Sequence, residues 1–304
     1  FQIGIAVGQP FLLNSITKVA SRWFPISERA TASGLGTLAM YFGILLGMSL
    51  TPFLVNGRGI GGMLYLYGTI SIATAVVFFI FARERPVTPP CRPDQEERAL
   101  AIEGMRLLFR NRDFLWLMLI FFIGLGVFNS VTTWIENILS PRGFSAEQAG
   151  IAGGLMILGG VAGAIIMPFL SDRYRRRIPF ISIALAGATL SLAMVTFTEN
   201  YTLLLVSAAA FGFFLLSSGP IGFQYGAEVT FPVSEGTSNG FLLLIGQVSG
   251  IAFIFSMDWF KSPVTGSMTM PLSVLSVLML ISFFLSARLS ESAFLTDNAK
   301  SESR

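Results

Sequence analysis

The residues of this sequence most able to do chemistry are uncharged polar side chains set inside long apolar runs. The interior of a bilayer holds no water for them, so each needs a polar partner on a neighbouring helix or on a bound solute. Tyr41 adds an aromatic ring, and such rings attract quaternary ammonium groups through cation–π interaction. The candidates for contact with a solute are Asn14, Tyr41, Asn129, Gln224 and Gln247. Hydrogen bonding between helices is the alternative role for each amide.

Acidic side chains could carry protons across a membrane, but none lies clearly at the middle of an apolar run. Glu136, near the end of one run, is the best remaining candidate for such coupling. The sequence contains no histidine and one cysteine, Cys91, so it holds no histidine-based triad, no histidine-ligated zinc and no intrachain disulfide. It also lacks a Gly-x4-Gly-Lys-Ser/Thr phosphate loop. We therefore expect no enzyme activity, no metal site and no cofactor.

The composition places these side chains on membrane-spanning helices. Apolar residues make up 53% of the 304 residues and charged residues only 12%, too few to cover a water-soluble surface of this size. Runs of about 20 apolar residues are long enough to cross a bilayer as helices. We expect an all-α polytopic bundle with nine spanning helices, at 1–22, 30–55, 60–82, 114–139, 146–170, 178–198, 201–226, 235–258 and 268–289.

The basic residues indicate the orientation of the bundle. Seventeen of the 20 Lys and Arg residues fall in one set of alternate loops, and basic loops favour the cytoplasm. We expect an integral plasma (inner) membrane protein whose central loop and C-terminus are cytoplasmic. The central stretch 83–113 fits either a helix lying on the membrane surface or a solvated linker. Because the basic residues alternate with apolar spans and form no patch, the lipid bilayer is the expected partner, and nucleic acid is not.

Two cytoplasmic turns nearly repeat each other. Residues 24–28 read Phe-Pro-Ile-Ser-Glu, and residues 231–235 read Phe-Pro-Val-Ser-Glu. Parallel repeats of this kind occur in transporters built from two halves, so we expect twelve helices in all, with three helices and about 85–90 residues preceding residue 1. The expected parts are the end of the first six-helix half at 1–82, a cytoplasmic linker at 83–113, the second half at 114–290 and a cytoplasmic tail at 291–304.

Residues 171–177 carry a loop motif, Ser-Asp-Arg-Tyr-Arg-Arg-Arg. Together with the two halves and the long central loop, it resembles the major facilitator superfamily, whose pattern here is close to Gly-x3-Asp-Arg-x-Gly-Arg-Arg. The matching residues are Asp172, Arg173, Arg176 and Arg177. Pro168 and Arg175 replace the two glycines. The superfamily fold brings the helices at 30–55 and 146–170 together, so their glycines are expected at the seam between the halves, with static packing as the alternative.

The resemblance implies a cytoplasmic gate. In the superfamily, the aspartate of this loop faces the N-terminus of a helix in the other half, here near Ser27, and latches the cytoplasmic side shut. Glu228 is expected to pair with Arg173 or Arg176. The predicted gating and charge cluster is Ser27, Asp172, Arg173, Arg176 and Glu228. A simple positive-inside anchor is the alternative.

A narrower resemblance rests on residues 220–250. The run 220–240 reads PIGFQYGAEVTFPVSEGTSNG, and 247–250 reads Gln-Val-Ser-Gly. Both are similar to the feline leukaemia virus subgroup C receptor-related family, whose members are associated with choline and haem transport. The family has a glutamine in helix 11, which Gln247 matches, and another in helix 5, where this sequence has Tyr41. The resemblance implies a small organic solute, such as a choline-like cation, as the partner.

These features predict a monomeric transporter, secondary active or facilitative, that moves a small organic solute by alternating access. A transport-inactive membrane receptor or scaffold of the same fold is the alternative. An integral-membrane enzyme is a weaker alternative, because the sequence has neither histidine nor an obvious pair of acids inside a span.

Overall fold

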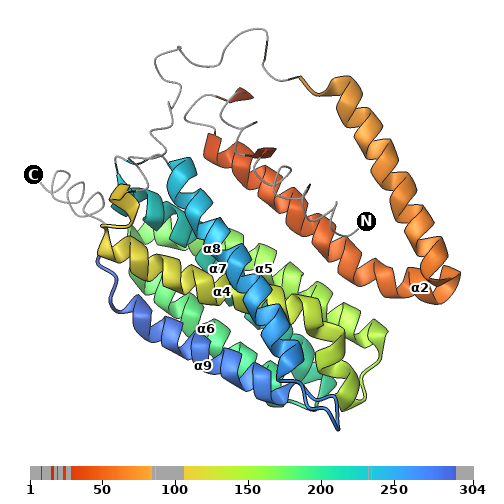
Figure 1. The fold of residues 1–304 in the computed structure, drawn as a ribbon. Helices are drawn as coiled ribbons and strands as arrows, with labels where there is room; N and C mark the ends of the chain where they lie inside the picture. The colour runs from red at the N-terminus through yellow and green to blue at the C-terminus, as the bar shows by residue number, and fades with distance from the viewer. Residues whose placement is uncertain are drawn as a thin grey trace, which may run out of the picture. The chain divides into compact units, whose positions relative to one another are not determined.

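The computed structural model describes residues 29–83, 106–231 and 235–291, together with single positions elsewhere, and every regular element among them is helical. The all-α prediction is therefore confirmed for these residues. The elements are α2 (Arg29–Phe81), α4 (Arg112–Leu139), the 3-10 helix η2 (Ser140–Arg142), α5 (Ala146–Tyr174), α6 (Ile178–Phe197), α7 (Tyr201–Thr230), α8 (Glu235–Trp259) and α9 (Thr269–Ser286) (Figure 1).

Seven described helices are long and apolar enough to cross a membrane. The predicted count of nine is not confirmed. The expected span 1–22 lies outside the described residues except at single positions. The expected spans 30–55 and 60–82 both fall within α2, whose helical backbone breaks at Gly59 (φ 67°, ψ 171°). The positive φ explains the glycine, because other residues are strained there.

The chain divides into two compact units, Phe1–Arg98 and Ala99–Arg304. In the first unit, the two arms of α2 diverge from the bend at Gly59 (Figure 1). A hydrogen bond of 2.7 Å between the hydroxyls of Thr51 and Tyr67 joins the arms across this bend. The division of the chain into the four parts expected from the sequence stays a prediction.

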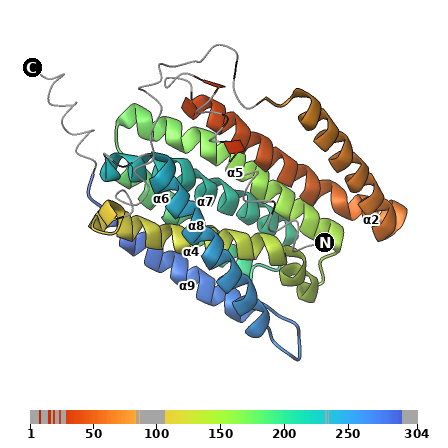
Figure 2. The ribbon, with the colours of Figure 1, turned by 45° about the horizontal axis from the view of Figure 1, so that its top comes forward.

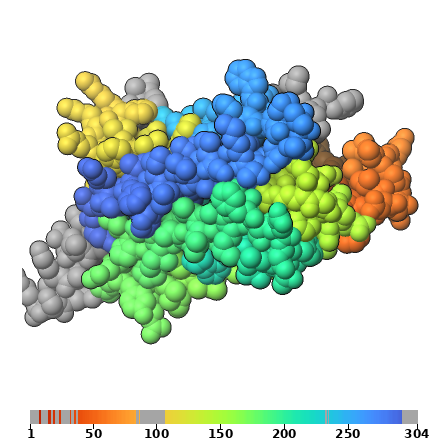
Figure 3. Space-filling view, turned by 90° about the horizontal axis from the view of Figure 1, so that it is seen from below, coloured from red at the N-terminus to blue at the C-terminus, as the bar shows by residue number. Residues whose placement is uncertain are grey.

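The second unit is a bundle of α4–α9. Helix α5 packs mainly against α7, α4 against α8, and α6 against both α7 and α9. Figures 1 and 2 show α4 and α8 side by side, and Figure 3 shows α9 alongside α6 on one face. Large apolar side chains cover the outside of the bundle, among them Leu190, Val206, Val277 and Phe284. A bilayer would solvate such a surface, whereas water would not.

Helices α5 and α7 approach so closely that their backbones nearly touch. A Cβ atom on Gly212 would lie 1.7 Å from the carbonyl oxygen of Met156, and one on Gly163 would lie 1.9 Å from that of Phe213. No side chain fits in these places, so glycine is required. Two of the glycines expected at the seam between the halves, Gly159 and Gly163, thus face α7 of their own unit, which is the static packing alternative.

Local capping residues set where the helices begin and end. Asn111 caps α4 by accepting from the Phe114 N–H at 3.1 Å. A capping box of Ser145 and Gln148 starts α5. Helix α5 ends where Arg175 takes up a left-handed conformation (φ 52°, ψ 39°) and its N–H turns back to the carbonyls of Ser171 and Asp172. This reversal brings the loop motif back over the end of α5.

Candidate functional site

The candidate site is an ion-paired cluster centred on Arg177, between the end of α5 and the start of α6. Arg177 is buried, with 6% of its surface exposed. Its guanidinium forms an ion pair through Nη1 with Oδ1 of Asp172 and another through Nη2 with Oε1 of Glu228, on α7, at 3.1 Å. Nε also donates to Glu228 at 3.3 Å, and Nη1 donates to the Ser171 hydroxyl at 3.2 Å. One planar cation therefore joins α5, α6 and α7, as the guanidinium fork allows.

The C-terminal segment also reaches this cluster. The Glu291 carboxylate accepts from the backbone N–H of Arg177 at 3.1 and 3.2 Å and from that of Ile178 at 3.1 Å. Next to it, the Tyr225 hydroxyl donates to the carbonyl oxygen of Ser290 at 2.8 Å. Glu291 thus supplies a negative charge at the N-terminus of α6, where the helix dipole stabilises it. Sequence reasoning missed Glu291; its place just after the last expected span, three residues after Arg288, was the available signal.

The electrostatics of the cluster favour the charged guanidinium. Burial alone would lower the pKa of Arg177, but hydrogen bonds and attraction from Asp172 and Glu228 outweigh this effect and raise that pKa. The two acids differ in exposure, because 65% of the Asp172 side chain is exposed but only 11% of Glu228. Oε2 of Glu228 is buried and has no hydrogen-bond partner among the described residues. Asp172 therefore presents a carboxylate to its surroundings, while Glu228 is held inside.

The predicted cluster is brought together in part. Glu228 pairs with Arg177, so its expected pairing with Arg173 or Arg176 is wrong. Arg173 lies in the last turn of α5 and Arg176 in the turn after it, and both are exposed. Arg177 forms this pair instead, because it immediately precedes α6 and the chain returning after α5 places it in the interior. Ser27 lies outside the described residues, so the latch between Asp172 and the first half stays a prediction.

The polar residues proposed for solute contact lie in different settings. Gln224 is exposed on α7, and its Nε2 donates to Glu228 Oε1 at 3.1 Å, so it belongs to the charge cluster. Asn129 on α4 is half-buried. Gln247 on α8 and Glu136 on α4 are exposed. Tyr41 lies half-buried on α2 in the first unit, and Asn14 lies outside the described residues.

Helices α4 and α8 place Asn129 close to the turn that carries Gln247. A Cβ on Gly246 would meet Leu125 at 2.2 Å, and a Cβ on Gly250 would meet the Asn129 Nδ2 at 2.7 Å. The two contacts are four residues apart on each helix, so the helices run side by side here. Gln247 precedes Gly250 by three residues, which puts it on a neighbouring position of the helix surface. The positions of Asn129 and Gln247 thus lie within about one helical turn of each other along the two helices.

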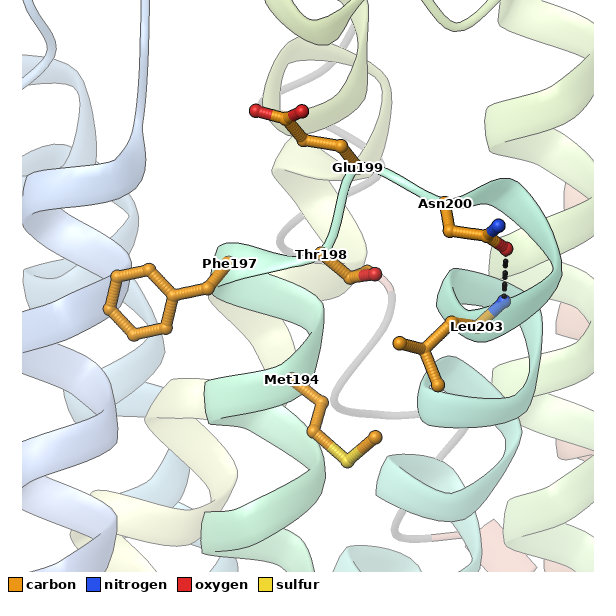
Figure 4. Close-up of a pocket in the computed structure, with 6 residues that line it drawn as sticks. All are labelled: Met194, Phe197, Thr198, Glu199, Asn200 and Leu203. Carbon is orange, nitrogen blue, oxygen red and sulfur yellow. Dashed lines mark hydrogen bonds between the residues drawn. The ribbon is translucent and has the colours of Figure 1, made fainter.

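A pocket of about 480 Å³ lies at the other end of α6, where the chain turns into α7 (Figure 4). Its lining residues are Met194, Phe197, Thr198, Glu199, Asn200 and Leu203. The Asn200 side chain is used there as the cap of α7, accepting from the Leu203 N–H at 3.1 Å. No predicted site residue lines this pocket. Among the described residues, no group of three or more Asp, Glu or Cys side chains is placed to hold a metal ion.

Comparison with known proteins finds a matching family model and similar membrane transport proteins. The family model described as Major Facilitator Superfamily matches residues 1–254. Solute carrier family 49 member A3 of Danio rerio is 30% identical over 265 residues, covering 85% of this chain and 56% of that protein. The choline/ethanolamine transporter FLVCR2 of Homo sapiens is 27% identical over 274 residues, covering 84% of this chain and 52% of that protein. The chain thus spans about half the length of the curated relatives it matches.

The solved structures agree on the fold. The fucose:proton symporter FucP of E. coli superimposes with a TM-score of 0.66 at 14% sequence identity, covering 95% of this chain and 75% of that one. At this identity the likeness concerns the fold alone. The family resemblance predicted from the loop motif and from residues 220–250 is confirmed by these comparisons.

Proposed function

Because the chain belongs to the major facilitator superfamily, we propose that it is part of a transporter that moves a small organic solute across a membrane by alternating access. Members of this superfamily are transporters and not enzymes. In this mechanism two halves rock about a central site, so contacts at one membrane face must form and break in each cycle. The protein needs groups that hold its cytoplasmic side shut in one state and release it in the other.

The cluster around Arg177 is the observation that carries the proposal. It is built from the superfamily loop motif, and its buried Arg177–Glu228 pair fixes the ends of α6 and α7. Asp172 is held by the same guanidinium and keeps most of its side chain exposed. An exposed carboxylate fixed in this way suits a reversible contact with a helix N-terminus, since the helix dipole attracts it. We assign Asp172 the role of the cytoplasmic latch, with Ser27 near its partner surface.

A choline-like cation is the proposed solute. The chain is similar to proteins named as choline/ethanolamine transporters, and it keeps Gln247 at the position of that family's glutamine in helix 11. Asn129 and Gln247 offer amide oxygens, which accept hydrogen bonds from a hydroxyl group. Tyr41 offers a ring for cation–π attraction, worth about 2 kcal/mol when desolvated.

The remaining assignments follow from charge and family. We propose a monomer in the plasma (inner) membrane whose central loop and C-terminus lie in the cytoplasm, because basic residues gather in that set of loops. Glu136 remains the proposed residue for coupling to protons. It lies exposed near the end of α4, on the side of the bundle away from Arg177.

Uptake of labelled choline by the full-length protein in proteoliposomes tests this function. We expect saturable uptake by the natural protein, and for Gln247→Leu a KM raised about 3- to 10-fold, the cost of one lost hydrogen bond from the choline hydroxyl. Gln148→Leu is the matched control, because Gln148 lies in the first turn of α5, where its side chain accepts from the Ser145 N–H. Binding of choline without any uptake would instead indicate a receptor or scaffold of the same fold.

A further inference from the structure

The segment that follows α9 is tied into the cytoplasmic cluster by both of its last described residues. We call residues 289–291 the C-terminal strap. Leu289 is 7% exposed, Ser290 accepts from the Tyr225 hydroxyl at 2.8 Å, and Glu291 accepts three backbone hydrogen bonds at the start of α6. A segment just past the last helix would be solvated and poorly ordered without such anchors. The strap is therefore a built contact.

Helix α6 has no cap of its own. Its cap residue is Arg177, whose guanidinium carries only N–H donors and therefore cannot accept from the first N–H groups of the helix. The first N–H groups of a helix need an acceptor. Glu291, 114 positions along the chain, provides it. Glu291 thus binds the backbone of Arg177, while the guanidinium of Arg177 binds Asp172 and Glu228.

We propose that Glu291 is a positioning residue of the cytoplasmic gate, acting on Asp172 through Arg177. This inference rests on the proposed transport function. Glu291 fixes the Arg177 main chain, Arg177 bridges Asp172 and Glu228, and Asp172 then lies where the latch needs it. Tyr225 strengthens the arrangement from α7, because it lies three residues before Glu228 and binds the adjacent strap residue. The strap, residues 289–291, is therefore part of the gate.

Release of the strap can be measured without any transport assay. Trypsin cleaves after Arg288, which is exposed but immediately precedes the buried Leu289, so cleavage requires the strap to detach. We expect Glu291→Gln to speed this cleavage about 10-fold, because the charged acceptor of the Arg177 and Ile178 N–H groups becomes neutral. Tyr225→Phe should speed it less. Glu199→Gln, an exposed acid at the other end of α6, is the matched control and should leave the rate unchanged.

The link from Glu291 to Asp172 predicts that their substitutions are not independent. Tryptic cleavage is compared for Glu291→Gln, Asp172→Asn and the double variant, and choline uptake is measured in the same set. We expect each single variant to lower kcat with little change in KM, and the double variant to be no slower than Asp172→Asn alone. A purely structural strap would lower the amount of folded protein and leave kcat per folded molecule unchanged.

Three outcomes would overturn the inference. The first is an unchanged cleavage rate in Glu291→Gln. The second is a kcat in the double variant that is lowered by the product of the two single effects. The third is faster cleavage of Glu291→Gln with a normal kcat. If the natural protein moves no choline, the proposed solute fails. In that case the cleavage rates of the two single variants and the double variant still test the role of the strap. Effects on the cleavage rate that simply multiply in the double variant would show that Glu291 and Asp172 act independently.

Discussion

Replacement of Arg177 by methionine should destabilise the protein by leaving Glu228 buried without its cation. The side chains of Glu228 and Arg177 are 11% and 8% exposed, so water cannot replace the lost partner. Among the described hydrogen bonds, only the Gln224 amide would still donate to that carboxylate. Removing one member of a buried pair costs about 3–5 kcal/mol. The exposed contact with Asp172 adds about 0–1 kcal/mol. We expect a loss near the lower end of the first range, since the cluster lies at the end of the helices.

Thermal unfolding of the purified full-length protein in detergent measures this loss. At roughly 2–4 °C for each kcal/mol, the midpoint should fall by at least about 6 °C. The double variant Arg177→Met with Glu228→Gln removes the unpaired charge, and it should regain about half of the loss or more. Arg177→Lys keeps the charge but cannot bridge two acids, so it should lie between the natural protein and Arg177→Met. A midpoint unchanged in Arg177→Met, or lower in the double variant than in the single one, would refute this account.

Three further substitutions probe the packing, the latch and the solute contact. Gly212→Ala forces a Cβ to 1.7 Å from a carbonyl oxygen and should cost about 3 kcal/mol or more in thermal unfolding; Gly219→Ala, on the same helix with nothing within 4 Å, should be neutral or stabilising. Asp172→Asn should lower the rate of uptake far more than the amount of folded protein, and equal losses in the two would count against the latch. Gly250→Ala moves the Asn129 amide and should raise KM by about 2- to 10-fold in an uptake assay; an unchanged KM would remove Asn129 from the solute site.

The sequence was sufficient for the helical architecture because long apolar runs leave few other structures in a bilayer. The six expected spans after residue 113 correspond to α4–α9, and the caps at Asn111 and Ser145 lie close to the expected starts. The break within α2 at Gly59 falls between the expected spans 30–55 and 60–82, because the polar and small residues 56–59 interrupt the apolar run there. Composition alone does not reveal which glycine takes a positive φ.

The partners within the charge cluster could be predicted from the sequence only in part. The motif identified the right loop and Asp172, and Glu228 was expected as a partner, but four arginines within residues 173–177 could not be told apart by charge. Their roles depend on where α5 ends and on how the chain turns at Arg175, which are properties of the folded chain. Glu291 was missed for a related reason, because 114 residues separate it from the backbone N–H that it binds.

Counterflow of labelled choline tests the central claim most directly. Proteoliposomes carrying the full-length protein are loaded with unlabelled choline, diluted into a trace of labelled choline and sampled over time. For a transporter that works by alternating access, we expect a transient accumulation of label above its equilibrium level. The accumulation should be larger than in vesicles without unlabelled choline and smaller in Asp172→Asn. The account would be contradicted if label binds to the protein but enters vesicles loaded with unlabelled choline no faster than vesicles without it. That result would favour a receptor or scaffold.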